Sequence, residues 1–390
     1  MNNDEAPLVE DETVDEDAGY QVLEYEITSS PNDFNVKTII DFIDKGVFKI
    51  PAFQRNYVWD ISRASKLIES LILGLPIPQI FLYEERDTKN SFIVIDGQQR
   101  LMTLYYFLKM RFPIMEKRFE LRMIFDHDGK IPDATLHDDQ YFTKFNLKLV
   151  SKLSGEKNKL HDLNYDTLSE FQTTLDLRTI RCIVIKQNFP EADDSSILEL
   201  FNRLNTGGVN LTPQEIRSSL YHSDFMKMIF TFNTDSRWRN LIDKPEPDLR
   251  MRDIEVLLRG FAMLLRGDNY TPSMTRFLNK FTKAMTRIPD EELTLLRNIL
   301  SRFLDRCDGF PRGIFGTRSK KLNISVYESV FSALCKTGYL NRKGEVPVID
   351  AKKIVELKKD KEFSESASTK STSKANVDSR LSRAREILLG

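Results

Sequence analysis

Residues 96–100, Asp-Gly-Gln-Gln-Arg, place one acid, one glycine, two amides and one arginine at the end of an apolar run. Residues 92–95 favour a strand and residues 101–108 have helical apolar spacing, so the pattern predicts a strand-to-helix turn. Such a turn directs backbone N–H groups and the positive end of a helix at a ligand, which favours an anion such as phosphate. The alternative is a plain turn in which Asp96 caps the helix and Arg100 lies on its solvated face.

A second polar cluster occupies residues 53–59, Phe-Gln-Arg-Asn-Tyr-Val-Trp. Arginine, glutamine and aromatic rings in an extended loop can stack on a nucleobase and reach a phosphate. An aromatic plug over the edge of the core is an equally good interpretation of Trp59. The candidate nucleotide-binding residues here are Gln54, Arg55, Tyr57 and Trp59.

A third cluster, residues 201–208, ends in Thr-Gly-Gly and could form a backbone nest for an anion. A helix C-terminus with glycine also ends this way for purely local reasons. Thr103 follows Arg100 on the same helical face and could add a hydroxyl to the site at the turn. The remaining candidates for nucleotide binding are therefore Gly97, Gln98, Gln99 and Thr103 at the turn, and Asn202, Arg203, Asn205, Thr206 and Gly207 in the third cluster.

The cysteines and histidines argue against a zinc or disulfide framework. The three cysteines, at 182, 307 and 335, are widely spaced and include no Cys-x-x-Cys pair, which suits a reducing compartment. The four histidines are scattered as well, so a catalytic metal would be a hard cation held by carboxylates and phosphate. Asp96 is the expected ligand of such a cation, because it is the only acid in the three clusters.

Charge and hydropathy predict a cytoplasmic protein without a membrane segment. The first twenty residues carry eight acids and no base, unlike a signal peptide, and no apolar stretch is long enough to cross a bilayer. The remaining 370 residues carry a net charge of +7, which is compatible with nucleotides or nucleic acid. The helical second half, rich in Leu and Phe, could also support a homo-oligomer.

The pattern of elements predicts an α+β protein, with a small mixed-sheet domain followed by a mostly helical one. We expect a disordered acidic tail over 1–30, a sheet domain over 31–195, a helical domain over 196–360, and a flexible linker with a short terminal helix over 361–390. The first helix should be capped by Asp33 or Asn35. The other expected elements are helices at 61–73 and 98–110, strands at 79–83, 92–95, 118–125 and 179–186, and helices at 196–204, 250–266, 273–287, 290–306, 324–336 and 349–359, with a capping box at 212–215.

Four motifs occur together in a fixed order along the chain, and a helix over 250–259 accompanies them. In this order and spacing, the chain resembles the N-terminal domain of the GmrSD type IV restriction endonucleases, over about residues 33–225. That family is related to the ParB/sulfiredoxin fold, in which the equivalent turn lines a nucleotide pocket. The motifs are Arg55-x-Tyr57-x-Trp59, Gly74-x-Pro76-Ile77-Pro78, Asp96-Gly97-Gln98-Gln99-Arg100-Leu101-x-Thr103, and Asn202-Arg203-Leu204-Asn205-Thr206-Gly207-Gly208-x-x-Leu211-Thr212-x-x-Glu215.

The resemblance implies binding and hydrolysis of a nucleoside triphosphate with Mg²⁺. In that interpretation Asp96 positions Mg²⁺ or the attacking water, and Arg100, with Arg55 or Arg203, offsets charge on the transferred phosphoryl group. Gln98 and Gln99 would orient phosphate or water. The catalytic residues expected are therefore Asp96 and Arg100.

The full restriction enzymes of this family also carry a His-Asn-His nuclease domain, which needs clustered histidines. Residues 226–390 contain no histidine, so we expect a separate nuclease or effector protein as partner in anti-phage defence. A second hypothesis is a DNA-binding module without catalysis, suggested by the basic body of the chain. A direct nuclease using Asp96 is the weakest hypothesis, because no convincing second acid accompanies that carboxylate.

Overall fold

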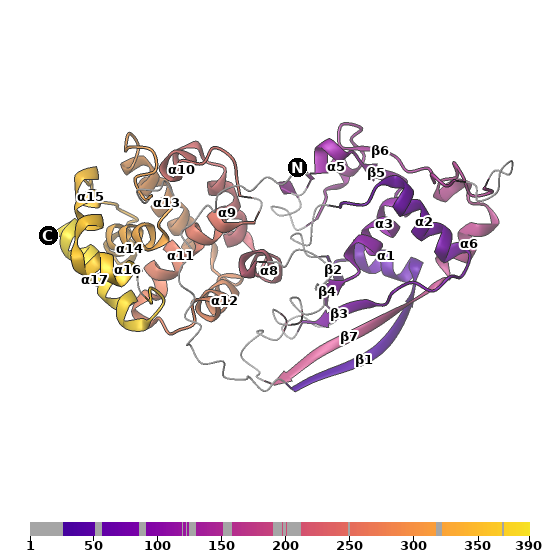
Figure 1. Cartoon of the computed structure of the whole chain (residues 1–390), viewed down its shortest axis with the longest axis horizontal. Coiled ribbons are helices and arrows are strands. Elements are labelled where there is room, and N and C mark those ends of the chain that lie inside the picture. Colours follow the sequence, from indigo (N-terminus) through magenta and orange to yellow (C-terminus); the bar gives the residue numbers. More distant parts are fainter. Residues whose placement is uncertain are drawn as a thin grey trace. The chain divides into compact units, whose positions relative to one another are not determined.

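The structure is a computed structural model, and it divides the chain into two compact units (Figure 1). One unit covers residues 24–211, and the other consists chiefly of Thr212–Gly390. No helix among the described residues is long and apolar enough to cross a membrane. The structure describes residues 26–50, 57–85, 91–118, 120–121, 123–124, 130–150, 158–189, 197, 200, 212–248, 250–316, 322–368 and 370–390.

The first unit is built on a mixed five-stranded sheet. The order across the sheet is β1-β7-β3-β4-β2. The β1–β7 and β3–β4 pairs are antiparallel, whereas β7–β3 and β4–β2 are parallel. This arrangement, followed by a helical unit, confirms the predicted α+β class with a mixed sheet. The strands are β1 (Glu26–Asn35), β2 (Phe48–Lys49), β3 (Ile80–Glu84), β4 (Phe92–Asp96) and β7 (Thr179–Phe189).

Amphipathic helices cover this sheet, and their buried faces make the core of the unit (Figure 1). On α1 (Val36–Asp44) the fully buried residues include Val36 and Ile39, and Asn35 caps the helix by accepting from Thr38 N at 2.8 Å. The remaining elements are α2 (Ile61–Ile72), α3 (Gln98–Leu108), α5 (Asp133–Leu136), α6 (Glu170–Asp176), the 3₁₀ helices η1 (Met115–Lys117) and η2 (Tyr165–Thr167), and a small antiparallel pair, β5 (Arg111–Pro113) with β6 (Phe142–Lys144).

Two expectations for the first unit are wrong. Residues 26–30, expected in a disordered tail, begin β1, which pairs along its length with β7. The first eight residues of β1 are exposed, so backbone pairing rather than an apolar pattern holds them. The strand expected over 118–125 is instead helical at its described residues. Arg118 and Leu121 are its buried positions, and a spacing of three residues is that of a helix face.

The second unit packs its helices around α11 (Arg252–Arg266) and α14 (Ile324–Leu340), whose side chains are buried over most of their length. Gly260 of α11 allows the rings of Tyr327 and Phe331 to approach the helix backbone. The predicted helices over 250–266, 273–287, 290–306, 324–336 and 349–359 are confirmed. The other helices are α8 (Pro213–Leu220), α9 (Asp224–Asn233), α10 (Ser236–Ile242), α12 (Met274–Met285), α13 (Asp290–Arg306), α15 (Ala351–Lys359), α16 (Lys361–Ser368) and α17 (Lys374–Leu389), with the 3₁₀ turn η3 (Gly267–Asn269).

The flexible linker expected within residues 361–390 is also wrong. Helix α16 occupies its first part with Phe363 buried, and Arg380 donates to the carbonyl of Ser371. Tyr270 Oη donates to Thr372 O at 2.6 Å. A Ser/Thr/Lys-rich composition suggested flexibility, but these tertiary hydrogen bonds hold the segment in place.

A buried carboxylate joins three helices of the second unit. Glu328 of α14 accepts from Arg259 Nε of α11 at 2.8 Å and from Arg380 Nε of α17 at 3.1 Å, and all three side chains are almost fully buried. Burial alone would raise the pKa of Glu328, but the two guanidinium groups lower it below the ordinary value of 4.5. Removing one member of such a cluster leaves a buried charge unpaired.

We expect Glu328→Ala to lower the free energy of unfolding by about 3–5 kcal/mol, measured by urea denaturation. The exposed Glu356 of α15 provides the control, because Glu356→Ala should change stability by less than about 0.5 kcal/mol. Because the pKa of Glu328 is lowered in the folded protein, its ionised carboxylate contributes to the free energy of unfolding above pH 4.5. This contribution is lost as the pH falls through the pKa of the folded protein. Equal stability of the two variants would contradict this account.

Candidate functional site

The predicted strand-to-helix turn is present at the end of β4. β4 ends at Asp96, Gly97 is the N-cap residue of α3 with φ +97°, and the helix begins at Gln98. A left-handed backbone conformation is readily available only to glycine, and a Cβ here would collide with Ile80 Cδ1. Gly97, not Asp96, is the N-cap residue of α3, so the interpretation of Asp96 as a helix cap is wrong.

Asp96 instead forms an ion pair with Arg100, one helical turn further on. The Asp96 Oδ2 to Arg100 Nη2 distance is 2.9 Å, and the side chains are 38% and 12% exposed respectively. Arg100 Nη1 also donates to the carbonyl of Pro78, and to that of Gln79 at 3.2 Å. Arg100 therefore ties the turn to the chain before β3 rather than lying on a solvated face. Burial lowers the pKa of Arg100, and the Asp96 carboxylate opposes that effect.

Residues 57–59, which we call the aromatic cluster, are attached to the same helix. Thr103 Oγ1 donates to Gln99 O at 2.7 Å and lies 2.8 Å from Tyr57 Oη, so the tyrosine donates to the threonine. Gln99 Oε1 accepts from Val58 N at 3.0 Å. The Tyr57 ring is buried edge-on against Tyr106, and burial raises the pKa of its hydroxyl. Of the predicted binding residues, Tyr57 and Thr103 thus contact each other and fix the cluster to α3.

Arg118 completes this arrangement, although the sequence pattern did not single it out. Its Nη2 donates to Trp59 O at 3.0 Å, and its guanidinium carbon lies 5.3 Å from the centre of the Tyr57 ring. Trp59 is partly buried and lies under Arg63, 4.7 Å from the guanidinium carbon to the ring centre. In the strand expected over 118–125, Arg118 would lie on the polar face, so only the correct helical periodicity would indicate that it points inward.

The other predicted site residues divide into two groups. Gln98 is buried in the first turn of α3. Within the described ranges, no group of three or more His, Cys, Asp or Glu side chains could hold a metal ion. The residues that lie outside the described parts of the chain are Gln54, Arg55, Asn202, Arg203, Asn205, Thr206 and Gly207, together with most of the helix expected over 196–204.

The predicted capping box at Thr212 is confirmed and belongs to the second unit. The Thr212 side chain accepts from Glu215 N, and the Glu215 side chain accepts from Thr212 N. Thr212 Oγ1 also donates to Arg250 O at 3.2 Å. One turn along α8, the buried Arg217 donates to Asn279 Oδ1 at 3.0 Å. These contacts dock α8 onto its own unit.

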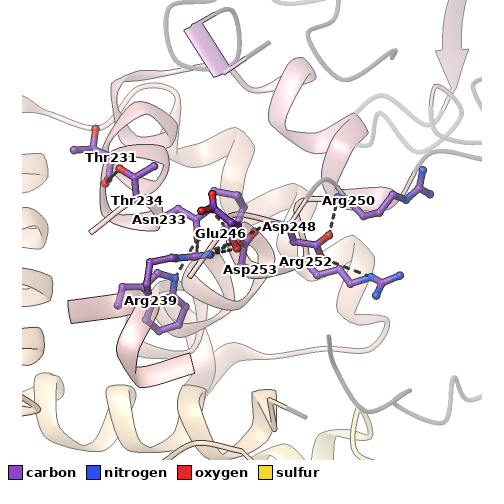
Figure 2. A network of polar contacts seen from close by, with 11 residues as sticks. Thr231, Asn233, Thr234, Arg239, Glu246, Asp248, Arg250, Arg252 and Asp253 are labelled. Carbon is purple, nitrogen blue, oxygen red and sulfur yellow. Dashed lines mark hydrogen bonds and ion pairs between the residues drawn. The ribbon is translucent and has the colours of Figure 1, made fainter. Parts of the chain in front are cut away.

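Figure 2 shows that the segment before α11 is organised around the buried carboxylate of Asp253. Asp253 Oδ2 accepts from Asn233 Nδ2 at 3.0 Å, from both terminal nitrogens of Arg239 at 2.9 Å, and from Asp248 N at 2.9 Å. Arg239 Nη1 donates as well to Glu246 O at 2.9 Å. All of these partners lie within the helical unit, so the network fixes the loop leading into α11.

We expect Gly97→Ala to destabilise the protein by about 1–2 kcal/mol, because an L-residue in the left-handed region is strained. The urea midpoint of unfolding measures this change. Gly46 also has a positive φ, +70°, but a Cβ added there would meet no atom within 4 Å. Gly46→Ala should therefore show the cost of backbone strain alone, and Gly97→Ala should cost more because its Cβ also collides with Ile80 Cδ1. A Gly97→Ala protein as stable as wild type would contradict the assigned turn.

Comparison with known protein families gives a match over residues 36–222. These residues match the family described as GmrSD restriction endonuclease, N-terminal domain. An uncharacterized protein of Methanocaldococcus jannaschii is 19% identical over 355 residues, covering 64% of this chain and 61% of that protein. This chain therefore spans less than two thirds of the length of that relative. No solved structure matches the chain.

Proposed function

Because residues 36–222 match the family described as GmrSD restriction endonuclease, N-terminal domain, we propose that this protein binds and hydrolyses a nucleoside triphosphate within a restriction system. It would act with a separate nuclease or effector protein in defence against phage DNA. The proposal rests on the turn between β4 and α3, where the family resemblance and the geometry coincide.

The observation that carries the proposal is the half-exposed carboxylate of Asp96 beside the N-terminus of α3. The first N–H groups of a helix have no partner within the helix and attract anions, while a carboxylate attracts the cation that accompanies a triphosphate. A Mg²⁺–triphosphate complex presents both charges together. The turn therefore offers complementary groups for one ligand within a few residues of chain.

The residues present suit a magnesium ion that arrives with its nucleotide. Mg²⁺ is commonly held by one or two carboxylates together with phosphate oxygens and water, so Asp96 alone can supply the protein ligand. When bound, the ion would neutralise charge on the phosphate oxygens. Among the described residues, no group of three or more His, Cys, Asp or Glu side chains could hold a metal by protein groups alone.

The contacts of Arg100 give it a positioning role in this proposal. Its guanidinium is shared among Asp96 and two backbone carbonyls, so it holds the carboxylate in a fixed orientation. Gln99 supports the same helix by holding the backbone at Val58. Offsetting the charge on the transferred phosphoryl group then falls to Arg55 or Arg203, which remain predictions.

The test is Asp96→Asn, which preserves the shape of the side chain and removes its charge. We expect nucleotide hydrolysis to fall at least a hundredfold, as is typical when one electrostatic contact to a transition state is lost. Steady-state release of inorganic phosphate from ATP and GTP, with Mg²⁺, measures the rate. Arg100→Lys should reduce kcat less than Arg100→Ala, because a lysine can still pair with Asp96.

Asp44 offers a closely matched control in the same unit. It pairs with Lys109 at 2.9 Å and is 39% exposed, so Asp44→Asn removes the same kind of ion pair away from the turn. That variant should hydrolyse nucleotide at the wild-type rate. Equal rates for wild type and Asp96→Asn, or equal losses in both Asn variants, would refute the assigned site.

A further inference from the structure

Helix α12 of the second unit lies in a stretch of chain without acidic residues. Residues 269–289 contain no Asp or Glu and four basic residues. The whole of residues 212–390 has 33 Lys and Arg against 23 Asp and Glu, a net charge of +10. The basic character of the unit is therefore concentrated where no acid on the same segment can offset it. The four basic residues are Arg276, Lys280, Lys283 and Arg287.

Three of these residues lie on α12, and Arg287 follows in the turn directly after the helix, so that together they form one stripe. Their spacings of four, three and four residues return to the same face of an α-helix, so the stripe runs for about 16 Å. Lys280 and Arg287 are exposed, and the opposite face buries Phe281 and Leu278 in the core of the unit. The backbone continues the helical course through Thr286, with Arg287 N donating to Ala284 O. We call these four residues the α12 basic stripe.

Basic residues elsewhere on this unit are commonly paired with acids. Lys336 and Arg385 both contact Asp268, and Arg342 contacts Glu292. By contrast, Arg276, Lys280 and Arg287 form no ion pair with any residue that the structure describes. The helix dipole favours cations in the last turn, but Arg276 and Lys280 precede that turn. Neither these ion pairs nor the helix dipole thus accounts for Arg276 and Lys280.

We propose that the α12 basic stripe binds the phosphate backbone of duplex DNA. Phosphates lie about 3.4 Å apart along the axis of each strand, so a stripe of about 16 Å can face several of them. A membrane-binding helix would need its apolar face free for lipid, whereas the apolar face of α12 is buried in the unit. This contact is independent of sequence, since phosphate contacts position a protein without reading bases.

This activity goes beyond nucleotide hydrolysis and does not use the turn at Asp96. A restriction protein must meet its DNA substrate, and a sequence-independent contact on the helical unit would hold the chain on DNA. The two activities are carried by different residues in different units. A variant can therefore lose one and keep the other.

The test is the full chain with Lys280→Glu and Arg287→Glu, both exposed residues whose replacement should leave the fold intact. We expect its affinity for a fluorescently labelled 30-base-pair duplex of random sequence to fall at least tenfold in an anisotropy titration at low salt. The neutral variant Lys280→Gln/Arg287→Gln tests the salt dependence. Its slope of log affinity against log salt concentration should be shallower than that of wild type by about 2, because each lost phosphate contact reduces the slope by about 1.

Helix α15 supplies a control of equal charge change. Lys352 and Lys359 are exposed there, so Lys352→Glu/Lys359→Glu alters net charge by the same amount at another place. That protein, and Asp96→Asn, should bind the duplex as wild type does. Equal loss in the α12 and α15 variants, an unchanged affinity of both α12 variants, or wild-type binding to anionic phospholipid vesicles without binding to DNA would overturn the proposal.

Discussion

At Gly97 the backbone passes through a left-handed conformation, and this allows a buried strand to end and a helix to begin within one residue. The turn places Asp96 and Arg100 one helical turn apart, close enough for a 2.9 Å ion pair. It also sets the direction of α3, whose side chains then hold Tyr57 and the backbone of Val58. The conformation of one glycine thus determines where the aromatic cluster and the acid lie relative to each other.

The two units use charged residues in different ways. In the helical unit, Asp253 and Glu328 are buried and fully engaged by arginines, so their charges organise helices instead of facing a ligand. Removing such charges from water is costly unless every partner is present, and this requirement selects one arrangement of the helices. In the first unit the acid at the turn is left half exposed. The degree of burial therefore separates structural carboxylates from one that can meet a ligand.

The elements with a clear apolar period could be predicted from the sequence. Helices α2, α11 and α13 were expected at nearly their observed bounds, as was the turn after β4. The contacts of the turn could not be predicted, because the carbonyls of Pro78 and Gln79 reach Arg100 only through the pairing of β3 with β4. Sequence spacing alone could not show that Arg100 points inward.

The wrong predictions have a common physical origin. β1 and the segment before α17 are stabilised by partners distant in sequence, namely β7 and Tyr270 respectively. The amino-acid composition of a segment does not reveal such partners. At 118–125 the short alternating run is compatible with the period of a strand and with the period of a helix. The burial of Arg118 and Leu121, three residues apart, indicates the helix.

β1 forms one edge of the sheet, and its exposed residues leave a row of backbone groups open to solvent. Pro31 lies within this strand and has no N–H to donate, and proline is tolerated in a strand only where that group faces away from the neighbour. A second chain adding to this edge would find its ladder of hydrogen bonds interrupted there. Pro31 therefore makes this edge of the β1–β7 ribbon a poorer template for an added strand.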